Sequence, residues 1–394
     1  MKTKLICIFI SLLTVACTNN TVEIKNGKKG LLKTTYSLEL TATKELSLDT
    51  LTAPKIQYSQ IYADSVGNRY FTFLNDYNNS IYFYDYTTLK FIKTIRFEKG
   101  TKGIKSPKGF YIKNMDSIFI YNKSMVEIVL ANQRGEILKR ISLNNKGIPK
   151  DWTQMYPQYH FETANPFMEV SGKLLLTGQY FGSLTEPMIP SFKFRAQVDL
   201  NTMKVDFRHT YPAELYGSDY NWEGGAFTEV YAELHPDGDK LIYSFPVSHD
   251  VYIVGINSDT YRKVYAGSNV AGTIHSIEGN PRKTDGQKSV AHYIREDLYS
   301  AIRYDKYRQV YYRFFLKGIP NASFATTMDD KPVSVIIMDK DFHYLGEKVI
   351  GTGRNWYWQN SFVTQEGLNI EYLDKDRDEK HLTLKIFTIK KNKK

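Results

Sequence analysis

The stretch YFTFLNDYNNSIYFYDYTTLKFIKTIRF, residues 70–97, decides the fold of this sequence. Aromatic and β-branched residues alternate with polar ones in three short segments, and Asn, Asp and Thr separate the segments. Side chains on one face of a β-strand recur at every second residue, and the separating residues favour turns. The stretch therefore predicts three antiparallel strands joined by tight turns.

The same rhythm of strands and turns recurs along the chain, about six times in all. It returns in GFYIKNMDSIFIYNKSMVEIVLANQRGEILKRISL, residues 109–143, and in the ranges 173–211, 227–265, 298–350 and 361–389. No segment has a persuasive helical pattern, and the best candidate, 290–300, is interrupted by polar residues. We therefore predict an all-β chain.

Radial repetition lets many short strands avoid open edges, so the repeats favour a β-propeller of six blades. The last repeat is one strand short. Residues 36–40 and 45–48 have the right composition to supply it, which would close the ring by pairing the N-terminal segment with the C-terminal blade. A pair of two-sheet sandwiches is the alternative fold.

The N-terminus indicates secretion. A basic start is followed by the apolar segment 5–15, which is too short to cross a membrane as a helix, and then by Ala16 and Cys17. The sequence Thr14-Val15-Ala16-Cys17 resembles a bacterial lipobox, although leucine is more usual where Thr14 stands. We expect a signal peptide at 1–16, a lipidated flexible tether at 17–34 and one propeller domain at 35–394. An ordinary signal cleaved near Ala16, with Cys17 incidental, is the alternative.

Composition narrows the function classes. The chain has only two cysteines, and Cys7 leaves with the signal peptide, so disulfides and thiol catalysis are excluded. The formal net charge of +10 is scattered except for basic residues near both ends, which either touch anionic lipid head groups or are solvated. Acidic residues, not basic ones, occupy the hairpins before the Tyr- and Arg-rich stretch 298–316, so we expect no nucleic-acid partner and a structural role for Arg303 and Arg313. We also expect a monomer.

Two short segments resemble ligand-binding motifs but lack residues that those motifs require. The segment DKDRDEK, residues 374–380, lacks the glycine and the final glutamate of a calcium loop, and it fits a hairpin tip better. GQKS, residues 286–289, echoes a phosphate loop whose first glycine would fall on Pro281. None of the eight histidines is spaced for zinc, and we predict no metal and no cofactor.

The four tryptophans are the most informative hint of function. They are predicted to lie in connections between strand repeats, together with tyrosines, a histidine and an arginine, and such connections form either lids over the core or an aromatic platform on one rim. The candidate ligand-binding residues are Trp152, Tyr156, Tyr159, His160, Tyr220, Trp222, Arg354, Trp356 and Trp358.

Three stretches carry a resemblance to a known family. They are KGFYIKNMDSIFIYN at 108–122, HPDGDKLIYSFPVSHDVYIV at 235–254 and YDKYRQVYYR at 304–313. The chain resembles the uncharacterised Bacteroidetes lipoproteins of the domain-of-unknown-function 4221 family over nearly all of its mature length. The resemblance implies a TolB-like propeller in the cell envelope, and it implies no activity and no functional residues.

These observations predict an outer-membrane lipoprotein, on the periplasmic face rather than the cell surface, that binds a glycan or protein partner through its aromatic rim. The alternative is a carbohydrate-active hydrolase or lyase with its active site in the propeller channel, because distant acidic side chains converge there in some propellers.

Overall fold

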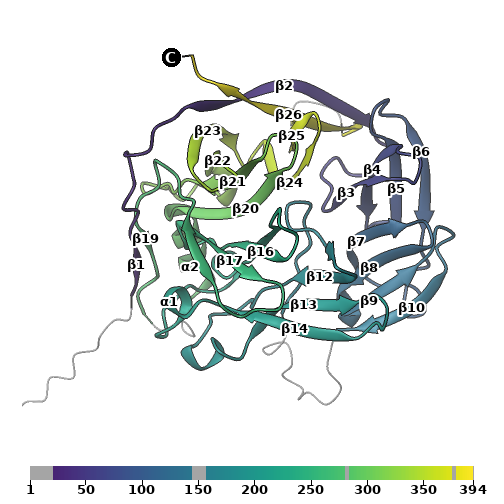
Figure 1. Cartoon of the computed structure of the whole chain (residues 1–394), viewed down its shortest axis with the longest axis horizontal. Coiled ribbons are helices and arrows are strands. Elements are labelled where there is room, and N and C mark those ends of the chain that lie inside the picture. Colours follow the sequence, from purple (N-terminus) through teal and green to yellow (C-terminus); the bar gives the residue numbers. More distant parts are fainter. Residues whose placement is uncertain (1–20, 144–156, 280–283, 375–378, 394) are drawn as a thin grey trace, which may run out of the picture.

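A computed structural model describes residues 21–143, 157–279, 284–374 and 379–393. In these residues the chain forms six four-stranded antiparallel sheets, arranged as a ring (Figure 1). The predicted six-bladed β-propeller is therefore confirmed, and the pair of sandwiches is excluded. A seventh, two-stranded sheet joins β1 (Glu23–Ile24) to β19 (Ile274–His275) at the outer edge of the ring.

The blades are numbered along the chain, and the strands of each blade are given from the axis outward. Blade 1 contains β3 (Ser59–Ala63), β4 (Arg69–Asn75), β5 (Ser80–Asp85) and β6 (Phe91–Arg96), and blade 2 contains β7 (Pro107–Asn114), β8 (Ser117–Asn122), β9 (Glu127–Ala131) and β10 (Ile137–Ser142). Blade 3 contains β11 (Met168–Val170), β12 (Lys173–Thr177), β13 (Lys193–Asp199) and β14 (Val205–Thr210), and blade 4 contains β15 (Tyr231–Leu234), β16 (Lys240–Ser244), β17 (Asp250–Gly255) and β18 (Arg262–Tyr265). Blade 5 contains β20 (Leu298–Asp305), β21 (Val310–Leu316), β22 (Pro332–Asp339) and β23 (Tyr344–Thr352), and blade 6 contains β24 (Trp356–Thr364), β25 (Gly367–Tyr372), β26 (His381–Lys391) and β2 (Tyr36–Ser47).

Blade 6 closes the ring as predicted. Its outer strand β2 comes from the N-terminal part of the chain and pairs with the C-terminal strand β26 from Tyr36 opposite Lys391 to Ser47 opposite His381. The two segments expected to supply the missing strand are one continuous strand, with a single register shift between Leu40 and Ala42. Backbone hydrogen bonds along this pair hold the first and the last strand of the six blades in one sheet.

The predicted all-β class is confirmed, but two helices form where the sequence showed no persuasive helical pattern. Helix α1 covers Ala213–Tyr216, and the longer α2 covers Gly286–Arg295. The side chain of Asp285 caps α2 by accepting a hydrogen bond from the backbone N–H of Lys288, so the GQKS segment is the first turn of a helix. Short 3₁₀ helices are η1 (Lys123–Met125), η3 (Glu186–Met188), η4 (Gly225–Phe227) and η6 (Met328–Asp330). Among the described residues no helix combines the length and the apolar character that a membrane crossing requires.

The core lies between neighbouring blades, because both faces of the middle strands are covered. Every residue of β21 is buried. Aromatic rings join adjacent blades, as where Phe194 of blade 3 meets Tyr243 of blade 4 edge to face, with ring centroids 5.1 Å apart. This packing explains why the strand sequences are apolar on both faces instead of alternating cleanly.

Arg313 on β21 has the structural role that the sequence predicted. Its guanidinium is fully buried and lies 4.0 Å from the centre of the Tyr299 ring. It donates hydrogen bonds to the backbone carbonyls of Ser248 at 2.9 Å and Ala266 at 3.1 Å, both in blade 4. A cation at the blade 4–blade 5 interface therefore satisfies carbonyls that the strand ladders leave open.

Part of the segment expected to be a flexible tether, 17–34, contacts the propeller. Besides the β1–β19 pair, the Asn26 side chain donates to the Ser268 carbonyl at 2.8 Å. Gly30 N–H donates to the Asn269 carbonyl at 2.8 Å. The purple strand in Figure 1 accordingly follows the edge of the ring from β1 to β2. Cys17 lies outside the described residues.

Candidate functional site

A cavity of about 390 Å³ lies at the axis, where the inner strands of blades 4, 5 and 6 begin. Tyr231 at the start of β15, Leu298 to Ser300 at the start of β20, and Trp358 near the start of β24 all line it. The short helix η4 and helix α2 contribute Phe227 and Tyr293. Three blades and two connections therefore build one concave site, and ligand sites are usually concave.

A tight turn that precedes blade 3 enters the axis and forms one wall of this cavity. The turn is closed by Asn165 N–H donating to the Glu162 carbonyl at 2.9 Å. Ala164 N–H donates to the carbonyl of Gln359 in blade 6 at 2.8 Å, and the Asn165 side chain donates to the carbonyl of Val230, before blade 4, at 3.2 Å. We call residues 162–165 the axial turn, and its contacts place the side chain of Glu162 in the cavity.

Two carboxylates, Glu162 and Glu229, share the cavity. Burial raises the pKa of Glu229 to about 7, although the Tyr231 hydroxyl donates a hydrogen bond of 2.7 Å to it. Burial and the negative charge of Glu229 together raise the pKa of Glu162 well above its usual value. One oxygen of Glu162, Oε2, is buried with no hydrogen-bond partner in the part of the chain that the structure describes. The two carboxylates therefore retain a proton at neutral pH.

A third acid that lines the cavity, Glu223, contacts a histidine. His292 on α2 bonds to Glu223 through Nδ1, while its Nε2 donates to the His275 carbonyl at 2.9 Å. Burial raises the pKa of Glu223, and the His292 contact opposes that rise. Glu223 therefore has a histidine partner, whereas Glu162 and Glu229 form no ion pair among the described residues.

Aromatic rings cover the other walls. Trp358 meets Tyr231 edge to face with centroids 5.8 Å apart, and Phe227 meets Tyr293 in the same way at 6.2 Å. Trp222 stacks behind Phe227 at 6.2 Å and so supports this wall without lining the cavity. The site thus combines flat apolar faces with acidic groups.

Of the predicted ligand-binding residues that the structure describes, only Trp358 lines the cavity. His160 lies next to it, since its ring stacks on Phe181, a lining residue, with centroids 6.0 Å apart. Burial lowers the pKa of His160. Trp152 and Tyr156 lie outside the described residues.

The other predicted residues have packing roles in the structure. Trp222 is 1% exposed, and its indole N–H donates to the Leu215 carbonyl at 2.7 Å. Tyr159 is also buried and packs on Tyr121, and Tyr220 packs against the core. Arg354 forms an exposed ion pair with Asp330.

The expectation that all tryptophans lie in connections is wrong for two of them. Trp356 and Trp358 belong to β24, the innermost strand of blade 6, which pairs with β25. Successive side chains of a strand point to opposite faces, and these two lie two residues apart. A register shift between Tyr357 and Ser361 nevertheless gives them different surroundings: Trp358 faces the cavity, and Trp356 packs on Phe387 at 5.4 Å.

The residues that sequence reasoning missed are the acids and tyrosines of the cavity. Glu162 lies two positions after the candidate His160, and Glu229 comes two positions before β15. The position of an acid just before an inner strand was a signal that could have found Glu229, whereas Glu162, six residues before β11, carried no such signal.

A second cavity of about 260 Å³ lies toward the opposite ends of the inner strands. Tyr58, Tyr111 and Arg303 line it, and Arg303 forms an ion pair with Glu233 at 3.4 Å. Lys306 lines it as well, so the charged side chains of this cavity include two cations and one acid, whereas those of the first cavity are acids.

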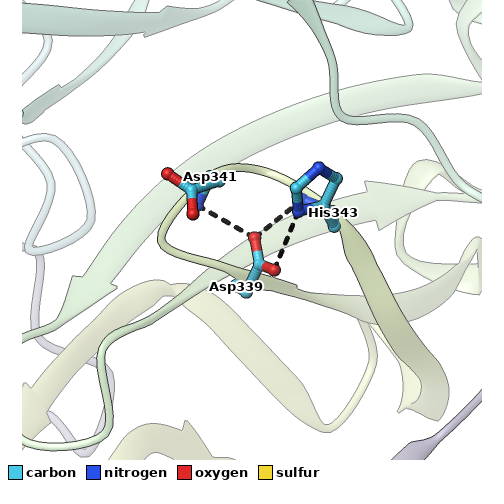
Figure 2. A group of neighbouring side chains, drawn as sticks. All are labelled: Asp339, Asp341 and His343. Atoms are coloured by element: carbon cyan, nitrogen blue, oxygen red, sulfur yellow. Dashed lines mark hydrogen bonds and ion pairs between the residues drawn. The ribbon is translucent and has the colours of Figure 1, made fainter.

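One exposed turn brings together three groups that could hold a metal ion, Asp339, Asp341 and His343 (Figure 2). One oxygen of Asp339 accepts from the backbone N–H groups of Asp341 and His343, both at 2.9 Å, and its other oxygen contacts His343 Nδ1 at 2.9 Å. These bonds tie together the β22–β23 turn. The turn alone accounts for the cluster, and no metal site is assigned to it.

Comparisons with known proteins agree with the architecture. A family model described as Domain of unknown function (DUF4221) matches residues 35–349. The crystal structure of a DUF4221 member from Bacteroides vulgatus is similar over 91% of this chain and 99% of its own, with a TM-score of 0.77 and 21% identity. A putative exported protein from Bacteroides fragilis is similar over 90% of this chain and 96% of its own, with a TM-score of 0.53 and 11% identity. No curated protein matches the chain. At these identities the structural likeness concerns the fold alone.

Proposed function

We propose, from the premise that this chain belongs to the DUF4221 family, that it is a ligand-binding β-propeller whose ligand enters the axial cavity. The observation that carries the proposal is the convergence of Trp358, Tyr231 and Tyr293 with the carboxylates of Glu162 and Glu229 in one concave site. Flat rings supply contact area at low entropic cost, and a few polar groups fix orientation.

The proposed binding site is an aromatic cavity at the axis, not the aromatic rim that the sequence predicted. Trp222 is buried and Arg354 is engaged in an ion pair, so neither supports a rim. A volume of about 390 Å³ suits a small organic molecule or the end of a larger chain, such as a terminal sugar or a peptide side chain. Glycans and proteins therefore remain within the proposed class of partner.

The test uses two tryptophans of one strand. Thermal-shift and calorimetric screens against glycans, peptides and small polar molecules would identify a ligand, and the ligand would then be titrated into Trp358→Ala and Trp356→Ala. We expect the first variant to lose at least about tenfold in affinity and the second to bind like the wild type, because only Trp358 lines the cavity. Circular dichroism would establish that both variants are folded. Equal affinities would contradict the site.

A second function, hydrolysis or elimination on a carbohydrate, is favoured by the carboxylates of Glu162 and Glu229. A carboxyl whose pKa is raised to about 7, as for Glu229, can give or take a proton near neutral pH. In that case Glu162→Gln and Glu229→Gln would each abolish turnover of a glycan but leave its binding largely intact. If both variants retained turnover, acid–base chemistry by this pair would be excluded.

We also propose that the protein is a lipoprotein of the outer membrane, on the periplasmic face. The support is the N-terminal sequence, in which an apolar segment leads to Ala16-Cys17. Labelling of cells with a fatty-acid analogue, followed by membrane fractionation, would test it. The wild type is expected to carry label in the membrane fraction, and Cys17→Ser is expected to carry none. Label on the variant would contradict lipidation at this residue.

A further inference from the structure

We infer that the axial cavity selects an organic cation, a ligand that presents a substituted ammonium group to Glu162 and Glu229. The inference rests on the proposed function, because it specifies the ligand class of that same site. It depends on the charges of the cavity wall, on the aromatic faces and on the unpartnered polar atoms, which are independent observations.

The charge of the wall is the first argument. Among the residues that the structure describes, three glutamates line the cavity, and no lysine, arginine or histidine does. Glu223 has His292 as its partner, whereas neither Glu162 nor Glu229 forms an ion pair within the described ranges of the chain. The basic group that acts on Glu162 from a distance is Lys55, which is held over the Tyr357 ring at 4.3 Å. A protein with a formal net charge of +10 thus keeps an acidic site at its axis.

The aromatic faces are the second argument. Trp358, Tyr231, Phe227 and Tyr293 surround the same space. A ring presents negative charge on its face, so an ammonium group is attracted to each ring whose face it meets. Acids alone would suit a hydrated metal ion, and rings alone would suit any flat apolar ligand. The combination favours an ammonium group that carries carbon substituents.

Polar atoms without partners are the third argument. The side chain of Ser300 is 1% exposed and lines the cavity, and its Oγ has no hydrogen-bond partner in the described residues. Glu162 Oε2 and Glu223 Oε2 are in the same condition. Buried polar atoms normally find a partner, and each of these three oxygens can accept a hydrogen bond, so they indicate a ligand with N–H or polarised C–H groups. An anionic ligand would be repelled by the carboxylates.

Cation binding would displace the proton that the acids hold. The proton leaves the carboxyl for the buffer, and the ammonium group takes its place as the counter-charge, so charge is balanced without any further reactant. We therefore expect affinity to increase as the pH rises from 6 to 8. The other titratable or charged groups that face this pair are Tyr231, Tyr293, Tyr357, Lys55, Glu371 and the Glu223–His292 pair.

The experiment compares two ligands of one shape. Calorimetric titration of the full chain with choline and with 3,3-dimethylbutan-1-ol, its uncharged carbon analogue, isolates the contribution of the charge, and 1,4-diaminobutane represents primary amines. We expect at least one of the two cations to bind at least about tenfold more tightly than the alcohol. Glu229→Gln should lose at least about tenfold of that affinity, and repeating the titration in buffers of different ionisation enthalpy should reveal proton release.

A matched control is Glu366→Gln, an acid that pairs with Lys44 and does not line the cavity, and it should bind like the wild type. The inference is overturned if neither cation binds, if choline and the alcohol bind equally, or if Glu229→Gln leaves the cation affinity unchanged. Failure of the inference is distinct from failure of the proposed function. If a neutral glycan binds the wild type but not Trp358→Ala, only the inference that the ligand is a cation is overturned. If ligands bind Trp358→Ala as well as the wild type, the proposed binding site is overturned.

Discussion

Lys331 illustrates what a single buried charge does in this fold. It is 1% exposed, and its ammonium group donates to the carbonyls of Tyr293 and Glu296, both at 2.6 Å. These carbonyls lie at the C-terminal end of α2, where helix carbonyls lack partners and a positive charge is favourable. Burial nevertheless lowers the pKa of Lys331 from 10.5 to about 7. Lys331 therefore connects α2 to blade 5, but the burial of its positive charge is unfavourable.

This cost predicts a pH dependence of stability. Between pH 7 and 10.5 the unfolded lysine binds a proton that the folded one has released, so this residue makes the free energy of unfolding rise with pH. We expect Lys331→Met to remove a slope of at most about 1.4 kcal/mol per pH unit in that window. Urea denaturation at several pH values measures it. The exposed Lys390→Met is the control, and the same slope in wild type and Lys331→Met would contradict the prediction.

Arg313 and Arg303 offer a contrast between a buried and a partly exposed arginine of one hairpin. Arg313→Ala leaves the carbonyls of Ser248 and Ala266 buried without these donors, so we expect the free energy of unfolding to fall by about 3 kcal/mol or more. Arg303→Ala removes only its ion pair with Glu233, and we expect a loss of about 1 kcal/mol. Chemical denaturation of both variants tests the difference. Equal losses would show that the hydrogen bonds donated by Arg313 contribute little to stability.

At the scale of elements, β2 and the segment before it have different roles. β2 is paired with β26 along its whole length, while residues 22–34 contact the edges of blades 4 and 5 through a few hydrogen bonds. A chain beginning at Thr35 should therefore fold cooperatively with a modestly lower Tm. A chain beginning at Leu48 lacks the outer strand of blade 6 and should lose cooperative unfolding. Calorimetry of the two shortened chains decides this, and a sharp transition in the shorter one would show that the ring does not need β2.

The elements were predictable where the pattern was local. Two-residue periodicity with Asn, Asp and Gly between strands identified about six repeats, and the missing strand of the last repeat identified β2. Helix α2 was missed because its apolar face is short and polar residues interrupt it, although Asp285 before Gly286 was a usable capping signal. Trp356 and Trp358 were assigned to a connection because indoles at the start of an inner strand resemble loop anchors in sequence.

At the scale of the molecule, the site was not predictable from local pattern. Glu162, Glu229, Tyr293 and Trp358 come from four separate parts of the sequence, and only closure of the ring brings them to one axis. No spacing rule relates these residues, because they lie on different blades and in connections that vary in length. The ring geometry had to be known before any residue could be placed.

The same closure makes the site a source of instability, which gives a prediction for the whole molecule. Because burial raises the pKa of Glu229 from 4.5 to about 7, the folded protein binds a proton in that window that the unfolded chain has lost, and this group makes stability fall as pH rises from 4.5 to 7. Glu229→Gln removes the titrating group. We therefore expect the free energy of unfolding to fall less in Glu229→Gln than in the wild type when the pH is raised from 4.5 to 8. The two changes should differ by up to about 3 kcal/mol.

Thermal and urea unfolding of both proteins at the two pH values measure this difference, and the exposed pair member Glu366→Gln should show no comparable change. An organic cation at saturating concentration should narrow the gap at pH 8, because a ligand that binds only the folded state stabilises it. A Glu229→Gln protein with the pH profile of the wild type would mean that the carboxyl is well solvated. In that case the carboxyl of Glu229 would hold no proton at neutral pH, and a cation that binds at the axis would displace none.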